Sequence, residues 1–393
     1  MLPQLFVAGS DGRWSSGLAD PGSDRTADDQ RSASFRLRPG ALWSDGLPIT
    51  ADDLRRSADG RFVAGVDDPA PDGTITVRFH DRLPAWRRLW SAQDSVAAPR
   101  PGVWGGPFVV GSMTPGLETV LARNDRWWGR RTAFLDEVRL VLVPDSTTAR
   151  LLLASNELDV VMPPAATVRT DQFEALAGVR VDRAMGGGWS VALETNPKRL
   201  GLEQRRAVLQ SIDRSSFVRT LLDGEATLLD GFASGEDETW TGAPVGEVGA
   251  LKGESLDLVG FSEEPMTGLV HRSMQKRARA AGGTIELRQA ETDRVETWLR
   301  DGEFEAGVVV ALDPLGHCWV CRWPDVVEAP AADTGDPQAV SALEQVLEDE
   351  ARVLPLWRPL TVVAFRDGLV GVQANGYAAS AAWNAWEWSR PGG

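Results

Sequence analysis

Hydrophobic residues in the first eighty positions follow the spacing of strands, with one helix between them. Segment 35–38 alternates Phe and Leu with arginines, and segment 74–80 places its Ile, Val and Phe on one face. This period of two predicts half-buried strands. Thr50 precedes the helical pattern and Asp53 follows three residues later, a spacing close to that of a capping box. The sequence therefore predicts two strands and a capped helix.

The middle of the chain alternates strands with a helix. Segment 138–143 (VRLVLV) is almost continuously apolar, which is typical of a strand in a sheet covered on both faces. A helix capped by Asp145 or Ser146 follows, and a short apolar strand comes at 160–161. Strand, helix and strand in this order predict a crossover unit and therefore an α/β sheet.

The second half continues the alternation, and we find no internal repeat. A helix over about 269–281 separates two apolar segments, and Pro337 occupies the first position of a later amphipathic helix. Residues 231–255 are rich in glycine and acids and are expected to form a long surface loop. Strands are predicted at the apolar segments 189–193, 256–260, 284–287, 306–312 and 361–365.

Length and charge limit the classes of protein. A chain of 393 residues is too long to fold around one ordinary hydrophobic core, so it indicates two lobes. Its net charge is −15, from 56 acids against 41 bases, which argues against nucleic acid as a partner because phosphate binding needs clustered Lys and Arg. No apolar run approaches the roughly 20 residues that span a bilayer. No signal-peptide pattern is visible at the N-terminus, so we expect a cytoplasmic protein or one whose leader has been removed.

The aromatic composition is biased toward tryptophan. The chain has 16 Trp and a single Tyr, Tyr377. An indole offers a broad stacking face and one N–H donor. Sixteen such rings are enough to line a binding surface as well as to fill cores.

Sequence motifs of enzymes are missing, so we predict no catalytic residues and no cofactor. The chain lacks G-x-S-x-G, H-E-x-x-H and G-x-x-x-x-G-K-[ST], and its triple glycine at 186–188 precedes a strand instead of a helix. His317–Cys321 (HCWVC) contains one C-x-x-C, whereas a zinc site needs four ligands and only His80 and His271 remain. We therefore predict no metal site, and either a local disulfide or two free thiols.

The order of these segments resembles a known family. FRLRPGALWSDGLPITADDL, GGPFVV with ETVLARNDRWWG, and VRLVLVPDSTTARLLLASNELDVV are similar, in this order, to segments of the extracellular solute-binding proteins, family 5. VALETN with EQRRAVLQSIDRSSFVRTLLDGEAT and LPLWRPLTVVAFRDGLVGV continue the resemblance, which covers about residues 1–230 and 340–393. Members of this family are the peptide-, nickel- and oligosaccharide-binding components of ABC importers.

The resemblance implies an α/β fold, the bilobal type II periplasmic-binding-protein-like fold, with two lobes joined by two hinge strands. Lobe I would comprise residues 1–197 plus 363–393, and lobe II residues 198–362. The strands would cross near Asn196 and Val363. The sequence departs from the family in a reduced inserted subdomain at about 55–100 and in the acidic loop near 231–255.

In this family the ligand lies between the lobes and is trapped by hinge closure without a chemical reaction. By segment position, Asp313 is the nearest match to the carboxylate that holds the amino terminus of a peptide ligand. The arginine that peptide binders carry just upstream is absent. The resemblance places further ligand contacts on aromatic rings near the expected cleft, which are Phe6, Trp189, Trp319, Trp383 and Trp386. Ordinary core packing is the alternative for each ring, and a simple turn is the alternative for Asp313.

The resemblance therefore predicts a monomeric binding protein, not an enzyme, that captures a small polar solute or peptide and delivers it to a membrane ABC permease. Such proteins are extracellular, periplasmic or anchored to the cell surface as lipoproteins, through a leader or lipid anchor that the given chain does not contain. Two alternatives stay open. One is a cytoplasmic ligand-sensing module of the same fold. The other is a redox or metal protein that uses His317–Cys321.

Overall fold

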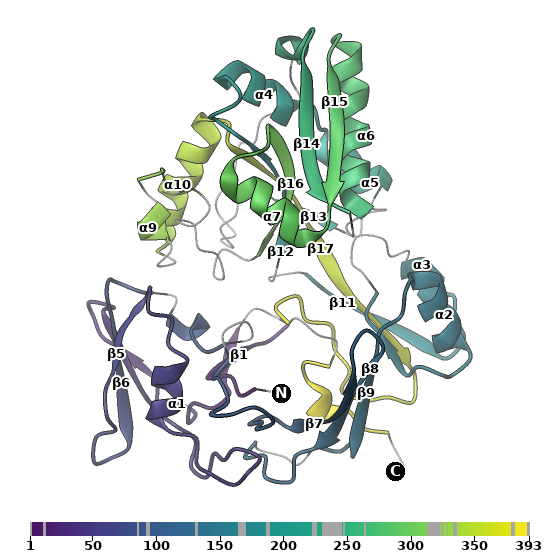
Figure 1. Cartoon of the computed structure of the whole chain (residues 1–393). Helices are drawn as coiled ribbons and strands as arrows, with labels where there is room; N and C mark the ends of the chain where they lie inside the picture. Colours follow the sequence, from purple (N-terminus) through teal and green to yellow (C-terminus); the bar gives the residue numbers. More distant parts are fainter. Residues whose placement is uncertain are drawn as a thin grey trace. The chain divides into compact units, whose positions relative to one another are not determined.

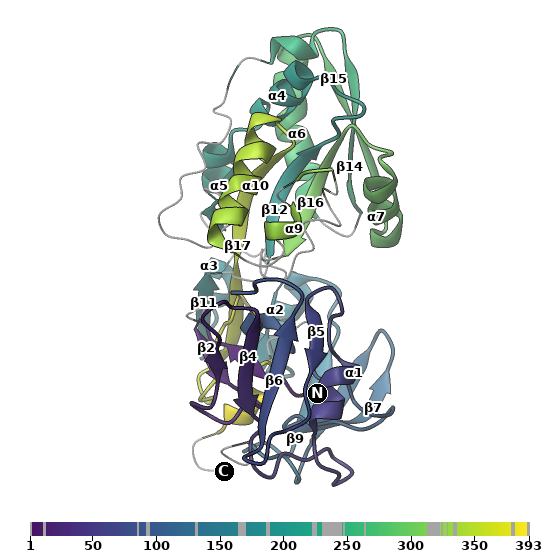
Figure 2. The ribbon, with the colours of Figure 1, turned by 90° about the vertical axis from the view of Figure 1, so that its left-hand side faces the viewer.

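The chain divides into two compact units in the computed structural model. Unit 1 contains the described residues of Met1–Pro163, Arg169–Ala184 and Thr361–Gly393, and unit 2 contains those of Met185–Leu360. Figures 1 and 2 label their elements. The residues that the structure describes are 2–10, 13–84, 86–91, 95–129, 133–163, 170–185, 189–221, 226–229, 246, 248–262, 265–312, 323, 325–327, 329–332, 336–378 and 382–390.

Three small antiparallel sheets build much of unit 1. The first joins β1 (Phe6–Ala8) to β2 (Trp14–Ser16). The second has the order β3-β4-β6-β5, with β3 (Arg25–Thr26), β4 (Ser32–Arg36), β6 (Thr74–Phe79) and β5 (Val63–Val66). The third has the order β7-β8-β9, with β7 (Phe108–Thr114), β8 (Glu118–Arg123) and β9 (Glu137–Val141). Unit 1 also contains two short helices, α2 (Ser146–Ala154) and α3 (Thr170–Glu174), and the 3-10 turns η1 (Trp86–Arg88) and η3 (Ala385–Glu387).

The opening helix of unit 1 begins as predicted. Helix α1 (Ala51–Arg56) follows Thr50, and the Asp53 carboxylate accepts a hydrogen bond of 2.8 Å from the Thr50 N–H. Asp53 is 5% exposed and also accepts a hydrogen bond of 3.2 Å from the indole N–H of Trp43, which is 1% exposed. One carboxylate therefore caps the helix and satisfies a buried donor of the core beside it.

The strand predicted at 138–143 is present as β9 (Glu137–Val141), but the prediction that both of its faces are covered is wrong. Strand β9 leaves Leu140, Val141 and the following Leu142 exposed, at 37%, 43% and 70%. It pairs only with β8 among the described strands, whereas β10 (Val160–Val161) joins a different sheet through β17. The expected crossover unit is therefore absent from this part of the described chain.

Unit 2 is an α/β unit in which one parallel crossover connects β14 (Ser255–Phe261) through α6 (Pro265–Ala280) to β15 (Thr284–Ala290). Strand β16 (Ala306–Leu312) lies parallel to β14 on its other side and antiparallel to β12 (Trp189–Thr195). The remaining elements are α4 (Leu202–Gln210), α5 (Arg214–Leu221), β13 (Ala226–Leu228), η2 (Gly249–Leu251), α7 (Thr292–Asp301), α9 (Ala329–Ala332) and α10 (Pro337–Asp349).

Helices cover both faces of the sheet in unit 2. Leu258 of β14 packs in one apolar cluster with Met266 and Met274 of α6, whereas the next residue, Val259, packs with Trp298 of α7. Successive side chains of a strand point to opposite faces, so α6 and α7 lie on opposite faces of the sheet. This arrangement explains why β16 is nearly all apolar (Figure 1).

Strand β17 (Val353–Arg366) belongs to both units. Its first part pairs with β12 and β13 in unit 2, and its last part pairs with β10 in unit 1, where β11 (Val179–Met185) also pairs with it. The units separate at Leu360/Thr361 and at Ala184/Met185. The sequence-based boundary at residue 197 instead places β12 with the first lobe. Among the described residues, none of the helices has the length and hydropathy that crossing a bilayer requires.

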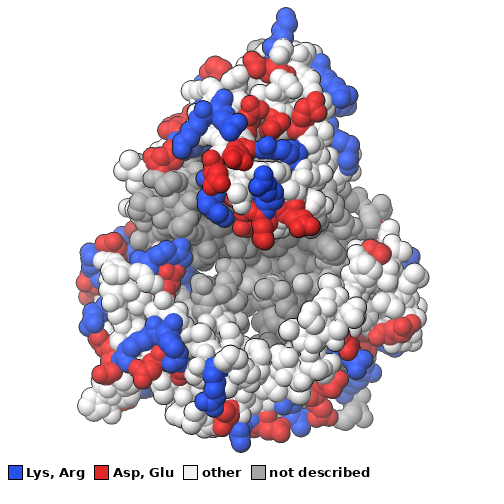
Figure 3. Space-filling model, in the orientation of Figure 1, with Lys and Arg blue, Asp and Glu red and all other residues white. Residues whose placement is uncertain are grey.

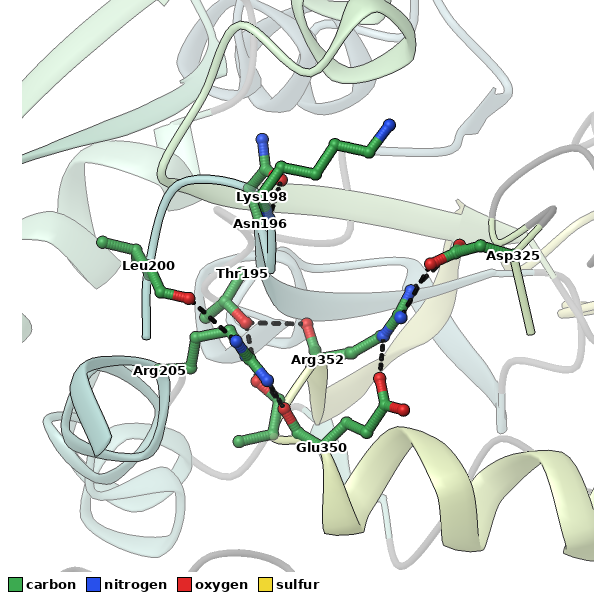
Figure 4. Close-up of polar contacts among 9 residues, drawn as sticks. Thr195, Asn196, Lys198, Leu200, Arg205, Asp325, Glu350 and Arg352 are labelled. Atoms are coloured by element: carbon green, nitrogen blue, oxygen red, sulfur yellow. Dashed lines mark hydrogen bonds and ion pairs between the residues drawn. The ribbon is translucent and has the colours of Figure 1, made fainter. Parts of the chain in front are cut away.

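A buried arginine pair ties the start of β17 to its neighbours in unit 2 (Figure 4). Arg352, whose side chain is 10% exposed, donates hydrogen bonds of 3.0 and 2.7 Å to the two carboxylate oxygens of Asp325. Arg205 donates to the main-chain oxygens of Glu350 and Leu200, at 2.7 to 2.9 Å. Burial lowers the pKa of Arg205, and the neighbouring charge of Arg352 lowers it further.

We expect Asp53→Ala to lower the free energy of unfolding by about 1–3 kcal/mol, because it removes the helix cap and leaves the Trp43 indole N–H without its acceptor. Asp52→Ala is the matched control, since the same helix carries Asp52 on its exposed side, and it should cost less than about 1 kcal/mol. Urea denaturation measures both values. Equal losses in the two variants would contradict the assigned role.

We expect Asp325→Asn to lower the free energy of unfolding at pH 7 by about 1 kcal/mol or less, because the Asp325 side chain is 54% exposed and solvent screens the pair. The hydrogen bonds from Arg352 lower the pKa of Asp325 in the folded state. The stabilisation is therefore complete above its ordinary pKa of about 4 and is lost as the pH falls through the folded-state pKa.

The measurement is urea denaturation of Asp325→Asn at pH 7 and pH 3. The control is Glu296→Gln on α7, because Glu296 is an exposed acid that forms no ion pair with the described residues. A difference between wild type and Asp325→Asn that grew on acidification would rule out this role for the ion pair.

Candidate functional site

A pocket of about 970 Å³ lies within unit 1. Most of its lining comes from four segments that are far apart in the sequence: residues 2–17, which include the β1–β2 hairpin, the loop at 105–107, the turn at 127–129 and the C-terminal segment at 373–387. Pro21, Arg38 and Phe134 complete the lining. In Figure 3, the described residues next to the hollow in the lower part are mostly neither basic nor acidic, and charged side chains of both signs lie farther out. The pocket is therefore a mainly uncharged cavity built by chain segments that only folding brings together.

Asn124 holds the turn at 127–129, which forms one wall of the pocket. Asn124, which is 6% exposed, donates a hydrogen bond of 2.8 Å to the main-chain oxygen of Gly106 and accepts one of 3.1 Å from the Arg126 N–H. A Cβ atom at Gly129 would lie 2.2 Å from the indole ring of Trp127, so only glycine lets the ring fold back over the turn. These contacts fix the position of Trp127.

Two further asparagines hold the C-terminal segment. Asn375, which is 3% exposed, donates a hydrogen bond of 2.9 Å to the main-chain oxygen of Ala8 in β1. Asn384 is fully buried, donates to the Gly371 oxygen at 2.7 Å and accepts from the indole N–H of Trp388 at 2.8 Å. Since buried amides need such partners, they fix the backbone on either side of the pocket-lining tryptophans.

Three of the tryptophans that line the pocket form a contiguous wall. The ring centroids of Trp127 and Trp386 are 5.8 Å apart with planes at 54°, and those of Trp383 and Trp386 are 6.3 Å apart at 84°. The indole N–H of Trp383 donates to the main-chain oxygen of Gln373 at 2.9 Å. Trp383 and Trp386 are only half-buried, so these contacts leave part of each indole open to the pocket.

Two charged side chains line the pocket among the described residues, Arg38 and Glu387. Arg38 donates to the main-chain oxygens of Ser16 and Gly17 at 2.9 to 3.2 Å, and its guanidinium carbon is 5.8 Å from the ring centroid of Trp128. The exposed Glu387 accepts a hydrogen bond of 3.3 Å from the Asn384 amide. The guanidinium of Arg38 is thus bonded to the main chain at the end of the β1–β2 hairpin, and Glu387 directly follows Trp386 in the sequence.

The lining suits binding better than catalysis. It contains neither His nor Cys, and its polar groups are amides, hydroxyls and one charge of each sign. In the described part of the chain, no group of three or more His, Cys, Asp or Glu is placed to hold a metal ion. A flat aromatic wall with few polar groups is a feature of small-molecule binding sites.

The structure brings together two of the residues that the sequence proposed as ligand contacts, Trp383 and Trp386. Phe6 does not line the pocket: it is 2% exposed, and its ring packs edge-on against Trp86 with centroids 5.3 Å apart. Its role as a ligand contact stays a prediction.

Trp189 begins β12 opposite Leu312 in unit 2, and its side chain lies outside what the structure describes. Asp313, Trp319 and the segment His317–Cys321 also lie outside the described residues. Their proposed roles in ligand or metal binding therefore stay predictions.

Sequence reasoning missed four lining residues as ligand contacts: Arg38, Trp127, Trp128 and Glu387. The pair Trp127-Trp128 stands out in the sequence, but it is indistinguishable there from a turn that packs two rings in the core. The signal that could have found it is Gly129, because a glycine directly after two bulky rings indicates a close approach of the backbone. Nothing in the sequence pattern distinguishes Arg38 or Glu387 from other surface charges.

Comparison with known proteins agrees with this picture. The chain is 29% identical over 262 residues to the oligopeptide-binding protein OppA of Mycobacterium tuberculosis, a match that covers 56% of this chain and 42% of OppA. The curated relatives that it matches are therefore covered over less than half of their length. OppA is named for binding oligopeptides.

Solved structures show the fold. The dipeptide-binding protein of Pseudoalteromonas sp. SM9913, in complex with Met-Leu, superposes with a TM-score of 0.81 at 14% identity, covering 99% of this chain and 94% of that one. The binding protein AgaA of A. tumefacien R10, in complex with agropinic acid, gives a TM-score of 0.80 at 18% identity, covering 99% and 92%. Both are binding proteins of the periplasmic type, as the sequence predicted for the fold class.

The family follows from the sequence of this chain. The family model described as bacterial extracellular solute-binding proteins, family 5 Middle, matches residues 14–252. This region includes β2, the loop at 105–107 and the turn at 127–129, and it includes neither β1 nor the C-terminal segment that lines the pocket. The resemblance predicted from the sequence motifs is confirmed, and the chain belongs to the bacterial extracellular solute-binding proteins, family 5.

Proposed function

We propose that the protein binds a small polar organic solute or a peptide reversibly and delivers it to a membrane ABC permease. Members of the family are binding proteins that act in ABC import outside the cytoplasm. The pocket of unit 1 provides the ligand-binding surface. The protein acts as a monomer and does not change its ligand chemically.

The observation that carries this proposal is the pocket itself. Ligand sites usually measure about 300–1,000 Å³ and combine aromatic walls with a few polar groups. The pocket of about 970 Å³ has such walls in Trp127, Trp383 and Trp386, and the exposed Gln373 supplies a polar amide. Its size corresponds to a ligand as large as a short peptide, and its wall favours ligands with flat or apolar groups.

We expect Trp386→Leu to weaken ligand binding about tenfold, because the indole is the central ring of the wall and contacts both of its neighbours. A thermal-shift screen of peptides, sugars and amines first selects a ligand by the stabilisation that binding confers. Isothermal titration calorimetry then compares the affinities of wild type and variant.

Trp104→Leu is the matched control, a half-buried indole of unit 1 that does not line the pocket. It should retain the affinity of the wild type. If Trp386→Leu folded normally and bound the selected ligand as tightly as wild type, the pocket would not be the binding site. If no compound of any class stabilised the protein, the proposal of solute binding would fail.

We further propose that ligand capture includes closure of the two units through the strands that connect them, as the family resemblance implies. Saturating ligand should then reduce the radius of gyration measured by small-angle X-ray scattering. The control is Trp386→Leu at the same ligand concentration, which should show a smaller decrease. An unchanged radius in wild type at saturation would contradict closure.

A further inference from the structure

The wall of the pocket has a geometry that selects among classes of ligand. Trp386 meets one neighbouring indole at 54° and the other at 84°, with centroids 5.8 and 6.3 Å away. A flat ring can stack on only one of two indoles turned by 84°, whereas a compact group in the corner between them can contact both rings.

The electrostatics of this corner favours positive charge. The face of an indole carries the negative end of its quadrupole, and tryptophan is the aromatic residue that attracts cations most strongly. Glu387 follows Trp386 directly in η3, is exposed and lines the same pocket as Trp383 and Trp386, so the pocket holds one carboxylate together with the corner. The net charge of −15 adds a long-range attraction for cations.

The pocket also contains one positive side chain, which sets where a cation can lie. The guanidinium of Arg38 is bonded to the main-chain oxygens of Ser16 and Gly17 and lies against the ring of Trp128. Arg38 therefore already places a positive charge at the hairpin wall, and a positively charged ligand group is repelled there. The carboxylate of Glu387 and the corner of Trp383 and Trp386 form the part of the lining that attracts a positive group.

From this geometry we propose that the ligand carries a quaternary ammonium group that binds in the corner between Trp383 and Trp386 with Glu387 as its counter-charge. The proposal rests on the proposed function, because it names the class of the captured solute. Asn384 positions the corner, since it fixes the backbone around both rings. The charge of the ligand, and not only its shape, then decides its affinity.

The test compares two ammonium compounds with uncharged compounds of the same shape. Choline is paired with 3,3-dimethylbutan-1-ol, and acetylcholine with 3,3-dimethylbutyl acetate, in isothermal titration calorimetry on the full chain. We expect each ammonium compound to bind at least about tenfold more tightly than its uncharged partner. The preference should fall when salt is raised from 10 to 150 mM, because salt screens the exposed carboxylate.

Two variants separate the ring contribution from that of the carboxylate. Glu387→Gln should weaken choline binding severalfold and leave the uncharged partner unaffected. Trp383→Phe should weaken choline binding less than Trp383→Leu, since phenylalanine keeps an aromatic face. Trp104→Leu is again the control outside the pocket, and the thermal unfolding of each variant shows that it is folded.

The outcomes distinguish this inference from the proposed function. Equal affinities within each pair, or no binding of either ammonium compound, would overturn the inference. If peptides or sugars bound instead, with an affinity that Trp386→Leu lowered, the class of ligand would be wrong and solute binding in this pocket would stand. If no compound of any class bound, both proposals would fail.

Discussion

Three buried asparagines are the constraint on which the pocket of unit 1 depends. Asn375 connects two segments that are remote in sequence, and Asn124 and Asn384 each join segments 18 and 13 residues apart. The three residues are 0 to 6% exposed. An unpaired amide in such a place costs about 1–3 kcal/mol, so each one specifies a single arrangement of the loops that it joins. Loops without regular hydrogen bonding can in this way present rigid indole faces to a ligand.

The two units rely on different sources of order. Unit 2 has a parallel crossover whose sheet is covered by helices on both faces, so its strand β16 is nearly all apolar and its elements specify one another by burial. Unit 1 uses small antiparallel sheets and irregular segments, in which single polar residues such as Asp53 and Asn384 connect the parts. The pocket lies in the unit with the less regular architecture, where loops carry its lining and a scaffold positions them.

Local signals in the sequence predicted local structure correctly. The acid three residues after Thr50 caps α1, Asp145 and Asp336 cap α2 and α10, and the apolar segment 306–312 is strand β16. The prediction that the strand at 138–143 is covered on both faces failed, because an apolar run indicates burial but does not identify the neighbouring strand. Leu140 and Val141 belong to a strand that the described residues of unit 1 leave exposed. Pairing between distant strands is set by the whole fold, and no window of the sequence contains it.

The candidate site shows the same limit. The family resemblance named Trp383 and Trp386, and both line the pocket. It did not name Arg38 or Glu387, since a charge becomes part of a pocket only when separate segments meet. The angle of 84° between two indoles is likewise a property of packing. The selectivity that we propose therefore depends on how rings and charges are turned toward one another, which residue types along a sequence do not encode one by one.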